Sequence, residues 1–463
     1  MAEIVVVHGL TAESRGTTFQ HTLSFGSYSF GHKVHYVNIF GLIPTTLCPE
    51  LVIFTYEFLA LRNLPIWKDL TQRIEPLARQ AKTVIAMPQD DYTRCAVLDD
   101  FFQVFKVDAV FTPITKDLEV LYPRSIASGI RFFEAFTGYF DERDWRKLSG
   151  FSKPLAERTI DIGQRVRLLS PQFGEIASRK GEIALDFARY AELRGFKCDV
   201  SVRDQDVITG DKWYEFLGNS RFTISRKGGA SLADPYGRIG DKIRRIQSRN
   251  PGASQEILEK AILSKMGHKG DFSAISPRLF EAAALGVCQI LETDTYVDGL
   301  EPWVHYLPLD SDFSNIESVF KAMDNFELCE EVVLNSQKVL LKQGVYTYDV
   351  LVKKVLSTAG ISLRSDLNSV MQDSSITLFS GQISNEQMAW IQRYVARAII
   401  NRRCKKAINH LSEGKLLKFA AEDVNWVQFA IENATLISDW IGRCMNDELL
   451  LESLLVHWVP ARR

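Results

Sequence analysis

Short apolar runs alternate with helical stretches along most of this chain, and that alternation restricts its fold more than any other feature. Residues 67–80 show a helical pattern. Five apolar runs on either side of it predict strands: residues 4–7, 34–39, 51–55, 83–87 and 109–112. Strands that alternate with helices are typical of α/β proteins with parallel sheets. The sequence therefore predicts an α/β fold.

A second series of the same kind follows the first. Its predicted strands are residues 165–168, 197–201, 221–225, 287–291 and 304–307, and its predicted helices lie around residues 180–194, 213–217 and 281. We therefore expect two Rossmann-like domains in tandem, over residues 1–155 and 156–363. Ligands of such sheets bind beyond the carboxyl ends of the strands. The expected site is thus the cleft between the two domains.

The end of the chain has a different pattern. Residues 364–375 are polar and aperiodic, which predicts a linker, and residues 376–463 predict an all-helical appendage. Its helix at 385–411 is basic and amphipathic. Such a helix can lie on an anionic membrane or belong to a bundle with a solvated face. Peripheral membrane contact and protein contact through this appendage both remain open.

The composition of the chain indicates which kinds of partner and which cellular compartment it suits. The chain has 463 residues, 46% hydrophobic and 24% charged, which is ordinary for a globular protein. Its formal net charge of -2 provides no overall basic field, so we expect no nucleic-acid partner. The seven cysteines are scattered, with no Cys-x-x-Cys pair, which suits a reducing cytoplasm. No signal peptide is visible, and we expect a cytoplasmic protein, free or peripheral to the membrane.

The stretch 276–291 carries the most chemical information. Ser276 suits a helix N-cap, Pro277 the first helical position and Gly286 the turn that ends the helix. Glu281 is a carboxylate among small apolar residues of that helix. A buried carboxylate needs a partner, and small neighbours leave room for a ligand. The alternative is an ordinary ion pair between Glu281 and Arg278, one helical turn away.

This stretch resembles the nucleotide-sugar-binding helix of group 1 (CgeB-like) glycosyltransferases. Their pattern is roughly Arg-x-Phe-Glu-Ala-x-Ala-x-Gly, and the matching residues here are Arg278, Phe280, Glu281, Ala282, Ala284 and Gly286. The likeness extends over about residues 80–355 and includes Glu301-Pro302-Trp303. It implies a GT-B-like fold, a UDP- or GDP-sugar donor, and a ribose contact for Glu281. Arg278 would belong to the same donor site.

Asp90 and Asp91 follow the predicted strand 83–87 within Gln89-Asp90-Asp91-Tyr92. The same family carries a similar Gln-Asp-Glu-Tyr, which makes these carboxylates the candidates for catalysis. A carboxylate at the rim of the cleft could act as general base on an acceptor hydroxyl. A solvated turn or an acidic first helical turn is the alternative.

Arg165 follows Asp161-Ile162-Gly163, and the family has a similar Asp-Ile-Gly-x-Arg. The resemblance implies that this arginine grips the donor diphosphate, which would also stabilise the leaving group. An outward-facing arginine on a surface strand is the alternative.

A glycine pair follows the predicted strand 221–225, in a loop from Lys227 through Gly228 and Gly229 to Ser231. Glycines let a backbone approach a phosphate or a sugar closely. Relatives commonly carry an acidic residue just before this Gly-Ala-Ser, whereas here Arg226 and Lys227 precede the glycines. The basic pair could contact phosphate instead, or the segment could be a plain turn with exposed cations.

The resulting hypothesis is a glycosyltransferase that moves a sugar from a nucleoside-diphosphate sugar to a saccharide or lipid-linked glycan acceptor, in the synthesis of a surface polysaccharide. No metal is expected if cationic side chains neutralise the leaving diphosphate. The alternatives are a sugar-nucleotide epimerase of the same fold and a non-catalytic module of a polysaccharide assembly complex.

Overall fold

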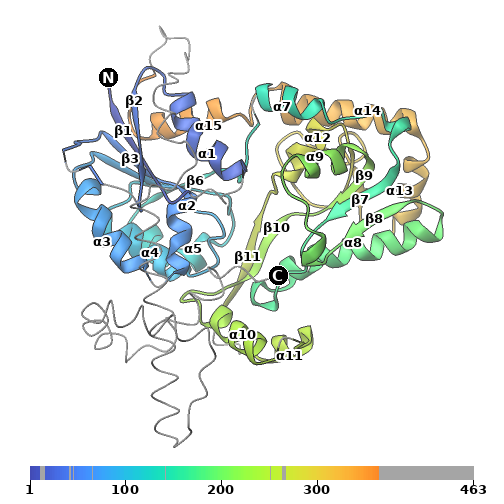
Figure 1. Cartoon of the computed structure of the whole chain (residues 1–463), viewed down its shortest axis with the longest axis horizontal. Helices are drawn as coiled ribbons and strands as arrows, with labels where there is room; N and C mark the ends of the chain where they lie inside the picture. The colour runs from blue at the N-terminus through green and yellow to red at the C-terminus, as the bar shows by residue number, and fades with distance from the viewer. Residues whose placement is uncertain are drawn as a thin grey trace, which may run out of the picture.

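A computed structural model describes residues 1–10, 16–40, 43–44, 46–64, 66–140, 142–250, 252–262 and 267–363. The chain forms two α/β units, drawn on the left and the right of Figure 1, with a two-stranded ribbon between them. The predicted linker and the appendage at 376–463 lie outside the described residues.

The first unit is built on a six-stranded sheet in which every pairing is parallel. The strand order is β2-β1-β3-β4-β5-β6. The strands are β1 (Glu3–His8), β2 (Lys33–Asn38), β3 (Leu51–Phe54), β4 (Thr83–Ala86), β5 (Ala109–Thr112) and β6 (Arg131–Glu134). The helices are α1 (Gly16–Ser27), α2 (Tyr56–Leu59), α3 (Trp67–Ala78), α4 (Cys95–Val104), α5 (Leu118–Leu121) and α6 (Pro123–Ala127).

The second unit has a five-stranded parallel sheet in the order β13-β12-β9-β7-β8. Its strands are β7 (Ile160–Arg165), β8 (Cys198–Ser201), β9 (Ser220–Ser225), β12 (Cys288–Glu292) and β13 (Leu307–Leu309). The helices α7 (Glu142–Ser149), α8 (Glu175–Leu193), α9 (Asp211–Gly218), α12 (Arg278–Ala284), α13 (Ile316–Met323) and α14 (Phe326–Gln337) surround it.

Both sheets begin with the same topology, in which the second strand flanks the first on one side and the third, fourth and fifth follow on the other. In each sheet the second strand is therefore added on one side of the first strand and the third strand on the other. The strand order reverses between β1 and β3 in the first sheet, and between β7 and β9 in the second. Doubly wound sheets bind ligands at the carboxyl ends of the strands at such a reversal. The predicted α/β fold with two Rossmann-like units in tandem, the GT-B-like arrangement, is confirmed.

The ribbon joins the second unit to the first. It consists of β10 (Gly228–Ala233) and β11 (His268–Ala274), paired antiparallel. Ala230, Ala233 and Phe272 of the ribbon are buried in the core of the first unit. Two helices, α10 (Arg238–Arg249) and α11 (Gln255–Lys260), are inserted between its strands. The chain crosses back once more in α15 (Tyr348–Thr358), whose Tyr348, Leu351 and Val355 pack in the other core of the first unit.

Two strands lie at slightly different positions in the sequence from those predicted. The strand expected at 165–168 is β7, which ends at Arg165. The sequence pattern does not reveal the start of this strand, because Asp161 and Gly163 are residue types that form strands poorly. Gly163 is nevertheless required, since a Cβ there would lie 2.0 Å from Ser220 Oγ. The strand expected at 304–307 is β13, which begins at Leu307 because residues 303–306 form a turn closed by Trp303 N and Tyr306 O.

No helix among the described residues combines the length and the apolar character that crossing a bilayer requires.

Candidate functional site

Three cations converge at the carboxyl end of the second sheet. Lys180 comes from α8, Arg226 follows β9 directly, and Arg278 begins α12. We call these three residues the cationic cluster. Burial, together with the nearby charges of Arg278 and Arg226, lowers the pKa of Lys180 to about 7. Among the residues that the structure describes, no hydrogen bond or ion pair to its ammonium is found, and a bound anion would supply a partner.

A buried carboxylate lies beside the cluster. Glu281 is 7% exposed, and its Oε2 accepts a hydrogen bond from Trp213 Nε1 of α9 at 2.9 Å. Burial raises the pKa of Glu281, while the Trp213 hydrogen bond and the charge of Arg278 lower it. The Arg278 guanidinium lies over the Trp213 ring, 4.9 Å from its centroid. One indole thus contacts both the carboxylate and the cation.

Gln164 ties this group to the strand ends. Its Oε1 accepts a hydrogen bond from Arg278 Nη1 at 3.1 Å, and its Nε2 donates to the Ile224 carbonyl. Gln164 lies on β7 and Ile224 on β9, the two strands where the sheet order reverses. The cationic cluster and Glu281 therefore occupy the position at which the topology predicts a ligand.

The local sequence explains how α12 presents these side chains. The helix ends as predicted at Gly286, whose φ of 62° is in the left-handed region. Gly286 N donates to Ala283 O at 3.0 Å and Val287 N to Ala282 O at 2.9 Å, the paired bonds of a Schellman motif. The predicted N-cap at Ser276 is wrong by one residue. The cap position is Pro277, and no side chain caps the helix.

The two basic residues after β9 face acidic residues at the end of β12. Arg226 Nε lies 3.0 Å from Glu292 Oε2, and Lys227 Nζ lies 3.2 Å from Asp294 Oδ1. The Lys227 ammonium also lies 5.8 Å from the centroid of the Tyr296 ring. Lys227 is therefore paired with an acidic residue of the second unit. It is not the exposed cation of a plain turn that the alternative interpretation described.

The predicted glycine loop is a strand. Gly228 and Gly229 open β10. A Cβ on Gly228 would lie 3.3 Å from Lys180 Nζ, so this glycine borders the cluster. Gly229 has a φ of 102°, and a Cβ there would lie 2.1 Å from the Phe272 carbonyl oxygen of β11. Gly229 is thus required by ribbon pairing. Ser231 accepts a hydrogen bond at 3.4 Å from Ile176 N at the start of α8.

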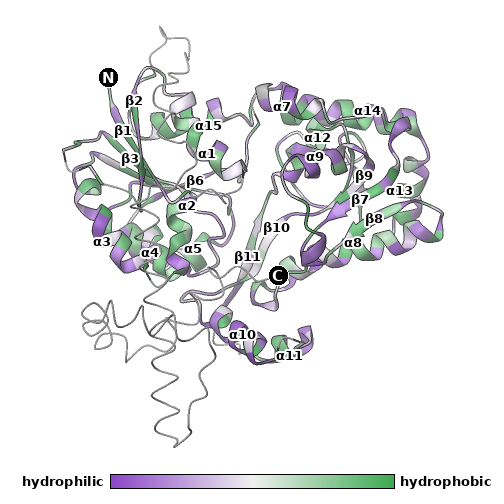
Figure 2. Cartoon of the chain, in the orientation of Figure 1, coloured by the Kyte–Doolittle hydropathy of each residue, from purple (hydrophilic) through white to green (hydrophobic). Residues whose placement is uncertain are grey.

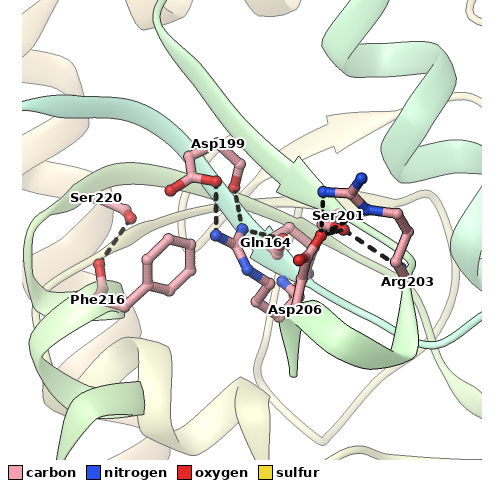
Figure 3. A network of polar contacts seen from close by, with 8 residues as sticks. Gln164, Asp199, Ser201, Arg203, Asp206, Phe216 and Ser220 are labelled. Atoms are coloured by element: carbon pink, nitrogen blue, oxygen red, sulfur yellow. Dashed lines mark hydrogen bonds and ion pairs between the residues drawn. The ribbon is translucent and has the colours of Figure 1, made fainter. Parts of the chain in front are cut away.

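Arg165 is directed away from the cluster, toward the β8 side of the sheet. Its Nη2 donates to Asp199 Oδ1 at 2.6 Å and its Nη1 to the Asp199 carbonyl at 2.7 Å. The guanidinium covers the Phe216 ring at 4.4 Å. Figure 3 shows Asp199 and Phe216 around this network, with Ser201, Arg203 and Asp206 beside it. Asp199 therefore occupies both terminal nitrogens of Arg165, while Arg165 Nε has no hydrogen-bond partner among the described residues.

The two predicted catalytic carboxylates have different surroundings. Asp90 is exposed, has a φ of 50°, and accepts a hydrogen bond from the Tyr92 hydroxyl at 2.7 Å. The Tyr92 ring packs against Phe173 of the second unit. Asp91 is 0% exposed. Its Oδ2 accepts from Thr112 Oγ1 at 2.5 Å and from Tyr122 Oη at 2.6 Å.

The structure therefore brings together Arg278 and Glu281, with Gly228 at their border, and keeps Arg165, Ser231 and Asp91 outside the group. The roles predicted for all of these residues stay predictions. The sequence motifs point to neither Lys180 nor Trp213. A signal for Lys180 was present, because it lies on the same face of the predicted helix as Ile183, Ala184 and Phe187, which are buried. Among the described residues, no group of three His, Cys, Asp or Glu side chains is arranged to hold a metal ion.

No protein-family model matches the chain, and no curated protein sequence matches it. Solved structures show distant likenesses. HepE from Anabaena, in complex with UDP-glucose, has 9% identity and a TM-score of 0.38, covering 77% of this chain and 100% of HepE. AviGT4, a glycosyltransferase involved in avilamycin A biosynthesis, has 9% identity and a TM-score of 0.38, covering 78% and 97%. Sucrose-phosphate synthase from Thermosynechococcus elongatus has 11% identity and a TM-score of 0.36, covering 77% and 98%. At these values the likeness assigns no function to this chain.

Proposed function

We propose that this protein is a glycosyltransferase that binds a nucleoside-diphosphate sugar at the carboxyl end of its second sheet. The observation that carries the proposal is the cationic cluster, in which the Lys180 ammonium has no partner among the described residues and lies beside Arg226 and Arg278. An ammonium without a described counter-ion beside two guanidiniums disfavours the apo state, and a bound diphosphate would relieve this repulsion. UDP and GDP are the nucleotides to test first.

The buried carboxylate complements the cations. A diphosphate alone would be repelled by Glu281, whereas ribose hydroxyls can donate hydrogen bonds to it. Oε2 of Glu281 holds the Trp213 indole, and we assign the ribose contact to Oε1. A site with cations at one end and a carboxylate at the other therefore fits the diphosphate and the ribose of one nucleotide.

The reaction needs a leaving group and an acceptor. The bond between the anomeric carbon and the diphosphate oxygen breaks, and the diphosphate leaves with the electron pair. The bond from an acceptor hydroxyl oxygen to that carbon forms, and the hydroxyl proton passes to a base. Lys180, Arg226 and Arg278 would stabilise the charge that develops on the diphosphate. We assign the acceptor side to Asp90, the exposed carboxylate of the 89–94 loop.

Calorimetric titration with UDP and GDP tests the donor site. A nucleotide at about 100 times its dissociation constant should stabilise the fold by roughly 2.7 kcal/mol. If no nucleotide binds at millimolar concentration, the proposal fails. Incubation with UDP- and GDP-sugars, with and without saccharide acceptors, then distinguishes the reactions. Conversion of the donor without an acceptor would indicate the epimerase, and binding without turnover would indicate the non-catalytic module.

A further inference from the structure

A pocket lies at the end of α12 that is opposite Arg278, and the donor site does not use it. Its lining residues come from α7, the segment 152–154, the last residue of α12 and the last residue of α14. These helices lie close together in Figure 1. The pocket has a volume of about 500 Å³, which is in the range of small-ligand sites. None of the described residues that line it is acidic.

A buried guanidinium lies behind one wall of this pocket. Arg158 is 3% exposed, and burial lowers its pKa to about 10. Its Nη2 donates to Ser152 Oγ, which lines the pocket, at 3.2 Å and to the Leu285 carbonyl at 2.9 Å. Its Nε and Nη1 donate to the carbonyls of Lys153 and Ser220, each at 2.8 Å. All of these acceptors are uncharged, and no carboxylate that the structure describes pairs with Arg158.

The end of α12 balances only part of the charge of Arg158. The carbonyl end of a helix carries about half of a negative elementary charge, and α12 is a short helix of seven residues. A guanidinium carries one full positive charge. Because a buried charge normally has a counter-charge, an anion in the pocket would supply what the helix end does not.

Two lysines add positive charge at the rim of the pocket. Lys153 lines it, and its ammonium donates to the amide oxygen of Asn219 at 3.1 Å. The Lys342 ammonium lies 5.7 Å from the centroid of the Trp145 ring. Neither lysine pairs with a carboxylate that the structure describes. Arg146 also lines the pocket, but another contact already engages it, so the positive charge at the rim comes from the two lysines.

One aromatic side chain provides a wall for a ring. Trp145 is half-buried, packs against the apolar cluster that contains Leu148, and also lines the pocket. It belongs to α7, which is otherwise largely hydrophilic and purple in Figure 2. Nucleobases stack on such rings, and the C–H face of a sugar packs on them in the same way. The pocket therefore combines positive charge with a surface for one flat ring.

We infer that this pocket is a second ligand site, which binds a small phosphomonoester with its phosphate beside Lys153 and its ring on Trp145. Arg158, offset by the helix end, and the two lysines leave roughly two to three positive charges. A phosphomonoester carries about 1.5 to 2 negative charges at pH 7, so it matches this charge better than one carboxylate does. A nucleoside monophosphate and a hexose phosphate share this chemistry. The inference does not depend on the proposed transferase, because Arg278 begins α12 and the pocket lies at Ala284, which ends it.

The test is calorimetric titration with UMP, glucose 6-phosphate and inorganic phosphate at low salt. At least one of the two esters should bind at millimolar concentration, and the tighter one identifies the ring. Inorganic phosphate should bind more weakly because it has no ring to place on Trp145. Uridine and glucose, which lack the charge, should not bind. Absence of binding by both esters overturns the inference.

Charge variants locate the ester. Lys153→Gln with Lys342→Gln should weaken its binding roughly ten-fold, because each exposed ion pair contributes little alone. The control Lys68→Gln with Lys321→Gln removes as many exposed cations, from α3 and α13, and should bind like the parent. Equal affinities in these two double variants would overturn the inference.

Two further variants test the ring and the position of the site. Trp145→Leu, checked by thermal melting, should weaken binding of the ester and leave that of inorganic phosphate unchanged. Lys180→Met alters the cationic cluster and should retain an ester site with the affinity of the parent. If no ester binds to Lys180→Met, the ester belongs to the donor site and the inference is wrong. Ester binding without any binding of UDP or GDP would refute the proposed transferase and leave this pocket a ligand site.

Discussion

Trp213 donates its indole N–H to the Glu281 carboxylate across 2.9 Å, and this bond fixes the carboxylate at the carboxyl end of the second sheet. The same indole lies under the Arg278 guanidinium. The sequence offered an ion pair between Glu281 and Arg278 as the ordinary explanation of this carboxylate. In the structure Trp213 is its hydrogen-bond donor, and Arg278 acts on it through charge.

Glu281→Gln should weaken nucleotide binding and leave the apo fold intact. The glutamine carbonyl can still accept the Trp213 hydrogen bond, so the melting temperature without ligand should change little. The charged acceptor for the ribose is lost. Hydrogen bonds to charged groups contribute about 1.5–3 kcal/mol, so affinity should fall roughly ten- to a hundred-fold. Calorimetry and thermal melts on one variant measure both quantities. A lower melting temperature with unchanged affinity would make Glu281 a structural residue.

Most of the fold could be predicted from the sequence, because buried parallel strands appear as short apolar runs whatever their partners are. The start of β7 could not, since Asp161 and Gly163 conceal it. The ribbon could not either. Gly228 and Gly229 resemble a phosphate loop, and only the close approach of Phe272 O shows that Gly229 serves strand pairing.

The sequence predicts the site residues that belong to one helix, but it does not predict those that come together from several elements. Arg278 and Glu281 belong to one motif. Lys180 joins them from a segment about a hundred residues earlier, and neither spacing nor composition reveals that meeting. Arg165 looked equally suitable for a phosphate, but Asp199 on the neighbouring strand is its partner.

Asp90→Asn and Asp91→Asn should separate activity from stability. Asp90 is exposed, so its amide should keep fold and nucleotide affinity while transfer to an acceptor is lost if it is the base. Asp91→Asn places an amide N–H₂ in the core where Asp91 Oδ1 has no described partner. That variant should lose roughly 1–3 kcal/mol of folding free energy. Urea denaturation and transfer assays give the two readouts, and full activity of Asp90→Asn would remove Asp90 from the mechanism.

Arg62 should be the strongest stability determinant of the Asp90 loop. It is 2% exposed and donates to the carbonyls of Leu59 and Thr93 at 2.9 Å and of Asp90 at 2.8 Å. Arg62→Met keeps an unbranched, largely aliphatic side chain, although a shorter one, and removes every donor. The unpaired buried carbonyls should cost on the order of 3 kcal/mol in urea denaturation.

The matched control for Arg62 is Arg79→Met. Arg79 is 67% exposed and paired with Glu75 on the surface of α3. Its loss should be below about 1 kcal/mol. Equal losses from the two variants would mean that the Arg62 hydrogen bonds contribute nothing to the loop.

Lys180→Met should stabilise the apo protein and weaken the donor complex. The folded pKa of Lys180, about 7, is below its unfolded value of 10.5, so the unfolded chain binds more protons between these pH values. Through this group the apo stability therefore rises with pH over that window. In Lys180→Met this increase of apo stability with pH should be absent. Because the variant has no poorly solvated ammonium, it should melt at a higher temperature than the parent at pH 7.

Nucleotide binding should show the opposite dependence on pH. A bound diphosphate raises the pKa of Lys180, so binding takes up a proton once the pH exceeds about 7. The dissociation constant of UDP in the parent should then increase by up to about ten-fold per pH unit between pH 7 and 9. In Lys180→Met, UDP should bind more weakly at pH 7, and its dissociation constant should change little between pH 7 and 9. Calorimetry at three pH values measures both curves, and parallel curves would show that Lys180 does not contact the diphosphate.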